Sequence, residues 1–229
     1  MASEPNVAFV AGLLGDPSRA AMCLALMDGR RVPASELARR AGISAQTASN
    51  HLAKLIDGGI VEVEHQGRWR YYRLASDEVA HALEALAVVA PRLRQSIASP
   101  NCRDQLELYA ARTCYRHLAG KLGVAIADGL LREQWIAVTD THYTITAEGA
   151  RRLEALGIDL QALHRGQRVV VRRCLDWSER RPHVAGPLGK ALANLAFSRD
   201  WVRRQKGTRA VHVTPFGRAE LKRLLRVNL

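Results

Sequence analysis

The chain has 229 residues, of which 48% are apolar and 24% are charged, proportions that exclude wholesale disorder and suit two or three small folded domains. No apolar run approaches the roughly 18 to 20 residues that a membrane-spanning helix needs, and no basic residues precede the first apolar stretch as in a secretory signal. The four cysteines, Cys23, Cys102, Cys114 and Cys174, form no CxxC pair. We therefore expect a protein of the reducing cytoplasm with no membrane partner.

The positive charge is concentrated in one half of the chain. The net charge of +12 divides into +1 for residues 1–98, with 11 basic and 10 acidic side chains, and +11 for residues 99–229, with 23 and 12. Such a field favours a polyanionic partner.

The first third of the chain has the pattern of two helices joined by a tight turn. Asp16-Pro17 begins an earlier helix, because Asp caps free amides and Pro fits the first helical position. A short helix at 35–41 is followed by Gly42, which suits a turn, and by a second helix from about Ala45 to Asp57. Gly58-Gly59 marks its end. This order is typical of a helix-turn-helix.

The helix at 45–57 carries amides, hydroxyls and a cation on one face, which are the groups that contact base edges and phosphates. A solvated polar face is the alternative. The next segment, residues 60–74, predicts a β-hairpin with its turn at Gln66-Gly67 and two arginines near the tip, in the manner of a wing. The candidate DNA-binding residues are Ser44, Gln46, Thr47, Ser49, Asn50, His51, Lys54, Arg68 and Arg70.

The runs DPSRAAMCLALMDG and SELARRAGISAQTASNHLAKLIDGGIVEVEHQGRWRYYRL resemble the ArsR/SmtB-type bacterial repressors, over about residues 7–98. The resemblance implies a homodimeric winged-helix protein that binds an imperfect palindromic operator in double-stranded DNA and leaves it when an effector arrives. It assigns the dimer interface to helices at 6–14 and 76–97. The apolar residues of the second helix agree, since they exceed what a lone terminal helix exposes.

The chain departs from the metal-sensing members of that family. Those members carry a CxC-type thiolate motif where this chain has Arg31–Glu36, or Asp/His pairs on the dimer helix, where Asp77 and His81 have no second histidine downstream. We therefore expect no metal at the usual family sites.

The second half contains an internal repeat. His117–Ile136 aligns without gaps to His183–Val202, with eight of 20 positions identical. Each copy continues into an alternating segment and a threonine-capped helix that shares the pattern TxxGxxxLxxL, at Thr146–Leu156 and Thr214–Leu224. Helix, hairpin and helix again resemble a winged helix, so we predict two degenerate units. Neither repeat has a polar recognition face, and three interpretations of the basic charge remain: a solvated surface, an extra nonspecific DNA clamp, or a site for an anionic effector.

Both repeats place a cysteine shortly before the equivalent histidine. If the two units pack pseudo-symmetrically, two cysteines and two histidines converge as a metal site, a thiol switch or the floor of a ligand pocket. The alternative is that the cysteines are core residues and that the histidines cap helices. The candidate effector- or redox-sensing residues are Cys114, Tyr115, His117, Trp135, Cys174, Trp177, His183 and Trp201.

These observations predict a mainly α protein with small β-hairpin wings. It has an ArsR-type winged helix-turn-helix domain for DNA binding and dimerisation at 1–98. An effector-sensing module of two winged-helix-like repeats, about 103–160 and 168–229, fills residues 103–229. The expected function is that of a repressor released by an unknown small-molecule effector, with no cofactor, catalytic residue or assigned metal ligand. The alternatives are a metal- or thiol-responsive repressor that uses Cys114 and Cys174, or a DNA-binding domain fused to an unrecognised enzyme. No GxSxG, phosphate-binding loop or HExxH motif supports an enzyme.

Overall fold

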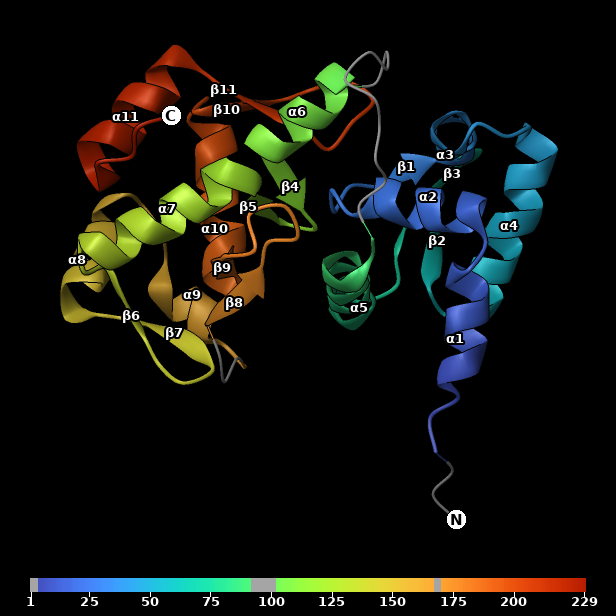
Figure 1. Ribbon diagram of the computed structural model, residues 1–229, viewed down its shortest axis with the longest axis horizontal. Helices are drawn as coiled ribbons and strands as arrows, with labels where there is room; N and C mark the ends of the chain where they lie inside the picture. The colour runs from blue at the N-terminus through green and yellow to red at the C-terminus, as the bar shows by residue number, and fades with distance from the viewer. Residues whose placement is uncertain (1–3, 92–101, 167–169) are drawn as a thin grey trace. The chain divides into compact units, whose positions relative to one another are not determined.

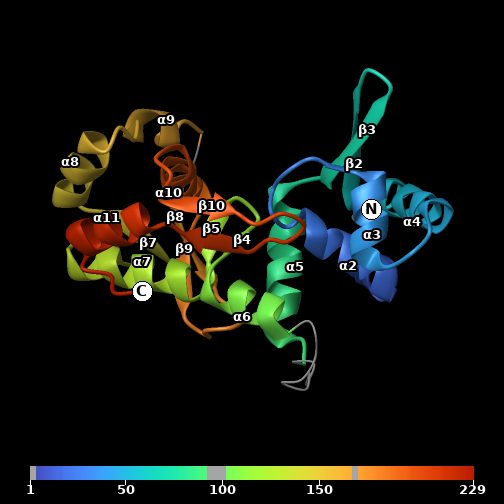
Figure 2. The same ribbon diagram turned by 90° about the horizontal axis from the view of Figure 1, so that it is seen from above.

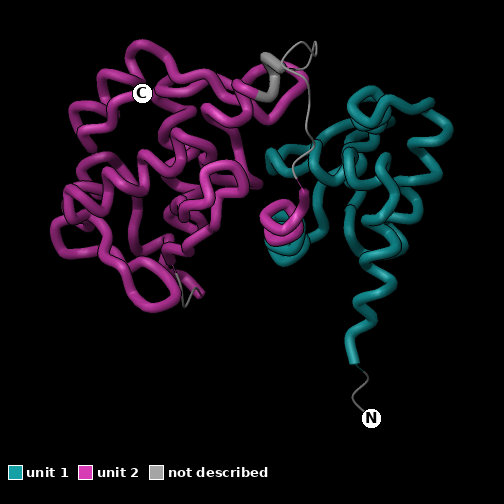
Figure 3. Tube along the Cα trace, viewed as in Figure 1, with its two compact units in different colours: residues 1–84 teal, residues 85–229 magenta. Residues whose placement is uncertain are grey.

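A computed structural model describes residues 4–91, 102–166 and 170–229, which divide into two compact units, 1–84 and 85–229 (Figures 1 and 3). The predicted domain boundary at residue 98 lies outside the described residues. Among the described residues, no single helix is long and apolar enough to cross a membrane, and one pair bent by 91°, Val7–Leu14 with Pro17–Leu26, passes only on length and composition.

The first unit is a winged helix-turn-helix. Its elements are α1 (Val7–Leu14), α2 (Pro17–Leu26), β1 (Val32–Pro33), α3 (Ala34–Ala41), α4 (Ala45–Asp57), β2 (Val61–Gln66), β3 (Trp69–Leu74) and α5 (Asp77–Val89), which continues past the division at residue 84. Asp16 accepts a hydrogen bond from Arg19 N at the start of α2, and Gly42 adopts φ +67° after α3, as the turn pattern requires. Ala48, Leu52 and Leu55 bury one face of α4. The helix-turn-helix prediction is therefore confirmed.

Two details of the first unit differ from the predictions. The wing turn is at Gly67-Arg68, one residue later than expected, because Gln66 pairs with Trp69 as the last residue of β2. The hairpin of β2 and β3 projects from its unit (Figure 2). The predicted dimer helix at 76–97 is observed as Asp77–Val89, and its residues 92–97 lie outside the described residues.

The second unit contains two copies of one element order, strand–strand–helix–strand–strand–helix, preceded by α6 (Cys102–Ala110). The first copy is β4 (Arg112–Cys114), β5 (His117–Ala119), α7 (Gly120–Arg132), β6 (Ile136–Val138), β7 (His142–Ile145) and α8 (Ala147–Ala155), followed by α9 (Leu160–His164). The second copy is β8 (Val171–Leu175), β9 (Pro182–Ala185), α10 (Gly186–Ser198), β10 (Val202–Arg204), β11 (Val211–Val213) and α11 (Pro215–Leu225).

The two copies exchange strands. The hairpin β6–β7 of the first copy pairs with β8–β9 of the second in one four-stranded antiparallel sheet, in the order β6-β7-β8-β9. The hairpin β10–β11 of the second copy approaches β4–β5 of the first through an antiparallel bridge between Arg112 and Ala210. Each copy thus extends the strands of the other, and one apolar core contains residues from both.

The aligned segment His117–Ile136 does not begin with a helix. Residues 117–119 form strand β5, and α7 begins at Gly120, with Ala119 as its N-cap residue and no side-chain cap. The second copy repeats this arrangement with Ala185 before α10. His117 and His183 are therefore strand residues, and the alternative in which they cap the repeat helices is wrong.

Small residues let each repeat helix approach the hairpin beside it. A Cβ atom built at Gly189 on α10 lies 2.5 Å from the Val184 carbonyl oxygen, too close for a side chain, and makes a tight contact of 3.1 Å with His117 Cβ. Gly123 on α7 approaches Leu118 and His183 in the same way. These glycines let the two histidine-bearing strands lie between the two helices.

Replacing Gly189 with alanine is expected to destabilise the second unit by about 1 to 3 kcal/mol, the usual cost of overpacking, because the backbone of Val184 must move. Urea denaturation followed by tryptophan fluorescence measures the change. Gly12→Ala on α1 is the matched control, since a Cβ there meets nothing within 4 Å. A Gly189→Ala protein as stable as the control contradicts the close approach.

Candidate functional site

Most of the candidate DNA-binding residues of α4 lie on its exposed surface. Ser44 is the N-cap and accepts a hydrogen bond from Thr47 N, and its Oγ lies 2.8 Å from Thr47 Oγ1, so these two hydroxyls also fix the start of the helix. Gln46, Ser49, Asn50 and Lys54 are exposed. The Gln46 side chain donates to Asn50 Oδ1 at 3.5 Å, which keeps the two amides side by side. The face therefore offers adjacent amide donors and acceptors at the helix surface.

His51 is held differently from the other candidates on α4. Only 16% of its side chain is exposed, and its Nδ1 lies 3.4 Å from an Arg19 guanidinium nitrogen and 3.9 Å from Asp16 Oδ1. Arg19 also donates to the carbonyl oxygens of Gly12 and Leu13. His51 thus connects α4 to the junction of α1 and α2, and a DNA contact from it stays a prediction.

One arginine of the wing is in an ion pair, and two are exposed near its tip. Arg73 pairs with Glu62 across the hairpin at 2.7 Å. Arg68 and Arg70 are exposed near the tip, and Arg68 lies 5.1 Å from the centre of the Trp69 ring. A phosphate contact from these two cations stays a prediction.

The second unit brings four of the predicted sensing residues together. We call Cys114, His117, Cys174 and His183 the Cys2His2 cluster; their ligand atoms all lie within 4.8 Å of one another. Each hairpin supplies one pair, because Cys114 is the cross-strand partner of His117 and Cys174 is that of His183. Of the alternatives left open by the sequence, the structure has the one in which two cysteines and two histidines converge.

The cluster is almost closed to solvent. Cys114, His117 and His183 are buried, and Cys174 is partly exposed. The Nε2 atoms of the two histidines lie 2.9 Å apart, so one nitrogen donates a proton and the other accepts it. The other ring nitrogen of His183, Nδ1, lies 3.3 Å from Asp176 Oδ2.

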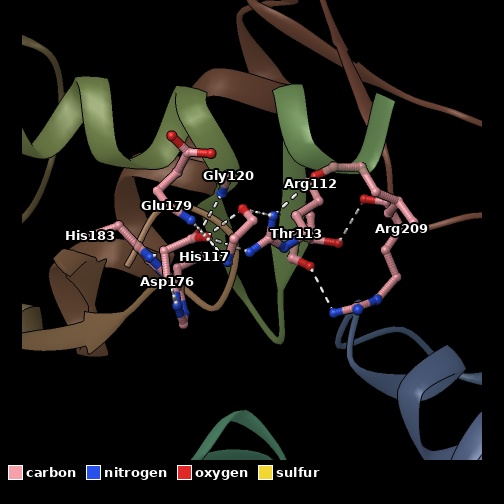
Figure 4. Close-up of polar contacts among 10 residues, drawn as sticks. Arg112, Thr113, His117, Gly120, Asp176, Glu179, His183 and Arg209 are labelled. Atoms are coloured by element: carbon pink, nitrogen blue, oxygen red, sulfur yellow. Dashed lines mark hydrogen bonds and ion pairs between the residues drawn. The ribbon is translucent and has the colours of Figure 1, made fainter. Parts of the chain in front are cut away.

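Asp176 is a buried carboxylate beside His183 (Figure 4). It accepts hydrogen bonds from the Arg112 guanidinium at 2.8 Å, from Gly120 N at 2.7 Å and from Ser178 Oγ at 2.7 Å. Neither side chain of the Arg112–Asp176 pair has exposed surface. Burial alone would raise the pKa of Asp176, but the hydrogen bonds from His183 and Ser178 and the charge of Arg112 hold it well below its usual value.

The cluster also changes the acidity of its own members. The hydrogen bond between Cys114 and Cys174 lowers the pKa of the Cys114 thiol well below its usual value, against the effect of burial, and both histidines add to this. Burial opposes a charge on His183, yet the contacts in which its ring nitrogens donate toward the acceptors Asp176 and Cys114 raise its pKa to about 9. By contrast, burial raises the pKa of Cys23 in α2 to about 12. The acidic thiol is thus that of Cys114, and its acidity comes from Cys174 and the two histidines of the cluster.

The predicted aromatic residues of the sensing site are divided between two places. Trp177 stacks at 4.2 Å from the Arg112 guanidinium, and Tyr115 occupies the turn between Cys114 and His117 with φ +54°. Trp135 and Trp201 are buried in the core and line a small apolar cavity together with residues such as Leu130 and Leu225. No residue of the Cys2His2 cluster lines this cavity. The cavity lined by Trp135 and Trp201 is therefore separate from the Cys2His2 cluster.

Sequence reasoning missed Arg112 and Asp176. Asp176 and Arg112 belong to none of the motifs that the sequence shows. Both lie next to cluster residues in the chain, two residues before Cys114 and two after Cys174. The available signal was therefore a charged residue two positions along the chain from each cysteine of the cluster.

A helix-turn-helix domain model matches residues 14–64. An uncharacterized HTH-type transcriptional regulator, YdfF of Bacillus subtilis, is 41% identical over 226 residues, which is 99% of this chain and all of that protein. The HTH-type transcriptional regulator Rv0324 of Mycobacterium tuberculosis is 34% identical over 85 residues, covering 37% of each chain.

Among solved structures, the homodimeric winged helix-turn-helix DNA-binding domain of Mb0332 from Mycobacterium bovis, described as a possible ArsR-family transcriptional regulator, is 30% identical. It covers 39% of this chain and 89% of that one, with a TM-score of 0.34. The match to YdfF extends over both units. The chain is a member of the family of HTH-type transcriptional regulators.

Proposed function

We propose that this regulator is a homodimeric repressor that binds an imperfect palindromic operator in double-stranded DNA. Each protomer places α4 in a major groove and the wing tip, with Arg68 and Arg70, against the adjacent backbone, so that the two half-sites lie about one helical turn apart. The exposed amide and hydroxyl face of α4, held by the Ser44 cap, is the observation that carries the proposal. Because the DNA of a bacterium lies in the cytoplasm, the protein acts there.

Exposed apolar side chains support the dimer. On α1, Val7 and Phe9 are 72% and 52% exposed, and no residue of that helix is buried. On α5, Leu86 and Val89 are exposed by 49% and 77%. A second copy of the chain covers such surfaces at lower free energy than water does. This interface uses the helices at 6–14 and 76–97 that the family resemblance implies.

The second unit is the proposed sensor. An effector bound there changes the spacing of the two recognition helices. The free energy by which it weakens DNA binding is set by how much more tightly the effector binds the DNA-free conformation than the DNA-binding one. The excess positive charge of residues 99–229 adds phosphate contacts of low sequence specificity.

Gln46→Ala and Asn50→Ala are each expected to weaken binding by about 1 to 3 kcal/mol, the value of a good base contact. The probe is the palindromic duplex that the full chain enriches most strongly from a random DNA pool, and fluorescence anisotropy measures its affinity. Gln161→Ala, at an exposed glutamine of α9, is the matched control and should bind as the unchanged protein does. Equal affinities for all of these proteins would remove α4 as the reader of the sequence.

A further inference from the structure

We propose that the Cys2His2 cluster binds one tetrahedral divalent cation of the zinc class. Two thiolates and two imidazoles are a donor set that such cations prefer. Zinc bonds of about 2.0 to 2.1 Å to nitrogen and about 2.3 Å to sulfur place tetrahedral ligand atoms roughly 3.3 to 3.8 Å apart. The ligand atoms here all lie within 4.8 Å of one another, so small side-chain movements complete the geometry.

The contact between the histidines supports an ion between them. Their Nε2 atoms already face each other at 2.9 Å, somewhat closer than two ligands on one ion. In a protein without metal this contact requires a shared proton in a buried site. A cation replaces that proton and accepts both lone pairs at once.

Asp176 prepares His183 for this role. Its carboxylate lies 3.3 Å from Nδ1, which favours a proton on Nδ1 and leaves the Nε2 lone pair directed toward the cluster. Carboxylate, histidine and metal in this order are a common arrangement around protein zinc ions. Asp176 is itself held by Arg112 and Gly120 N, so it is a positioning residue rather than a ligand.

The position of the cluster assigns the ion a mechanical role. One Cys–His pair comes from hairpin β4–β5 and the other from hairpin β8–β9, which belong to different repeats. A bound cation therefore joins the two repeats at the place where their hairpins and helices cross. Three of the four ligand residues are buried, which is typical of a closed structural site without an open coordination position.

Cobalt(II) is the probe for this site, because tetrahedral Co²⁺ absorbs strongly in the visible and thiolate ligands add charge-transfer bands in the near ultraviolet. The reduced full chain, treated with chelator and desalted, is titrated with Co²⁺. We expect one Co²⁺ per chain with both sets of bands, and their loss when Zn²⁺ is added. The double variant Cys114→Ser with Cys174→Ser should lose the charge-transfer bands and bind Co²⁺ at least about 100-fold more weakly, beyond the loss typical of outer-shell changes.

Three further variants separate binding from folding. His117→Cys keeps four donors and is expected to keep stoichiometric binding with stronger charge-transfer bands. Cys23→Ala removes a buried thiol of α2, and His212→Ala removes an exposed histidine of β11; both should bind as the unchanged chain does. Absence of stoichiometric Co²⁺ binding by the unchanged chain, or bands that persist in the double cysteine variant, overturns the proposal.

Discussion

Replacing Asp176 with asparagine is expected to destabilise the second unit by about 3 to 5 kcal/mol, the cost of removing one partner from a buried ion pair. Both side chains of the pair are fully buried, so in the variant the Arg112 guanidinium would remain buried without a negative charge beside it. Asparagine has nearly the same shape, so the change removes charge rather than packing. The second unit should therefore unfold at a much lower denaturant concentration.

Tryptophan fluorescence during urea denaturation measures this effect, since three of the four tryptophans, Trp135, Trp177 and Trp201, are in the second unit. Asp128→Asn is the matched control. Asp128 pairs with Arg181 at 2.7 Å, but 35% and 60% of these side chains are exposed, so the same change should cost only about 0 to 1 kcal/mol. Equal losses in the two variants would contradict a special role for the buried pair.

The DNA-binding helix was predictable because its signals are local. Asp16-Pro17, Gly42, the Ser44 cap and the buried stripe of α4 act within a few residues of one another, and α4 has the predicted bounds of Ala45–Asp57. Local signals failed for hairpin β4–β5. Its turn places a tyrosine, Tyr115, at φ +54°, where glycine or asparagine is the usual choice, so the tertiary structure rather than the turn sequence fixes it.

The Cys2His2 cluster could be predicted only through the repeat. Equivalent positions in two copies that pack pseudo-symmetrically can meet at the shared axis. The repeat alignment therefore relates Cys114 and His117 of one copy to Cys174 and His183 of the other. The strand exchange between β6–β7 and β8–β9 had no sequence signal, because each pairing partner is in the other copy. Asp176 and Arg112 were missed for the same reason: an isolated acid and an isolated arginine acquire meaning only once β4 and β8 are brought together.

Adding Zn²⁺ to the metal-free chain is expected to raise the free energy of unfolding of the second unit by about 4 kcal/mol when free Zn²⁺ exceeds its dissociation constant 1,000-fold. The ion binds four side chains that only the folded unit assembles, so binding free energy becomes folding free energy. The measurement is urea denaturation in a zinc buffer, with Cys114→Ser/Cys174→Ser as the variant that should not respond and Cys23→Ala as the one that should. A response of equal size in the double cysteine variant would place the zinc elsewhere.

The same zinc buffers also separate a structural ion from a regulatory one, and this step rests on the proposed function. By linkage, if Zn²⁺ changes the affinity for DNA by some factor, DNA changes the affinity for Zn²⁺ by the same factor. A regulatory ion therefore shows two equal shifts, each typically 5- to 150-fold, whereas an ion that only joins the repeats shows neither. If zinc stabilises the fold while DNA affinity stays constant, the metal site stands and the effector lies elsewhere. If the chain binds no DNA, the proposed function fails. The metal site is then judged only by whether zinc stabilises the second unit.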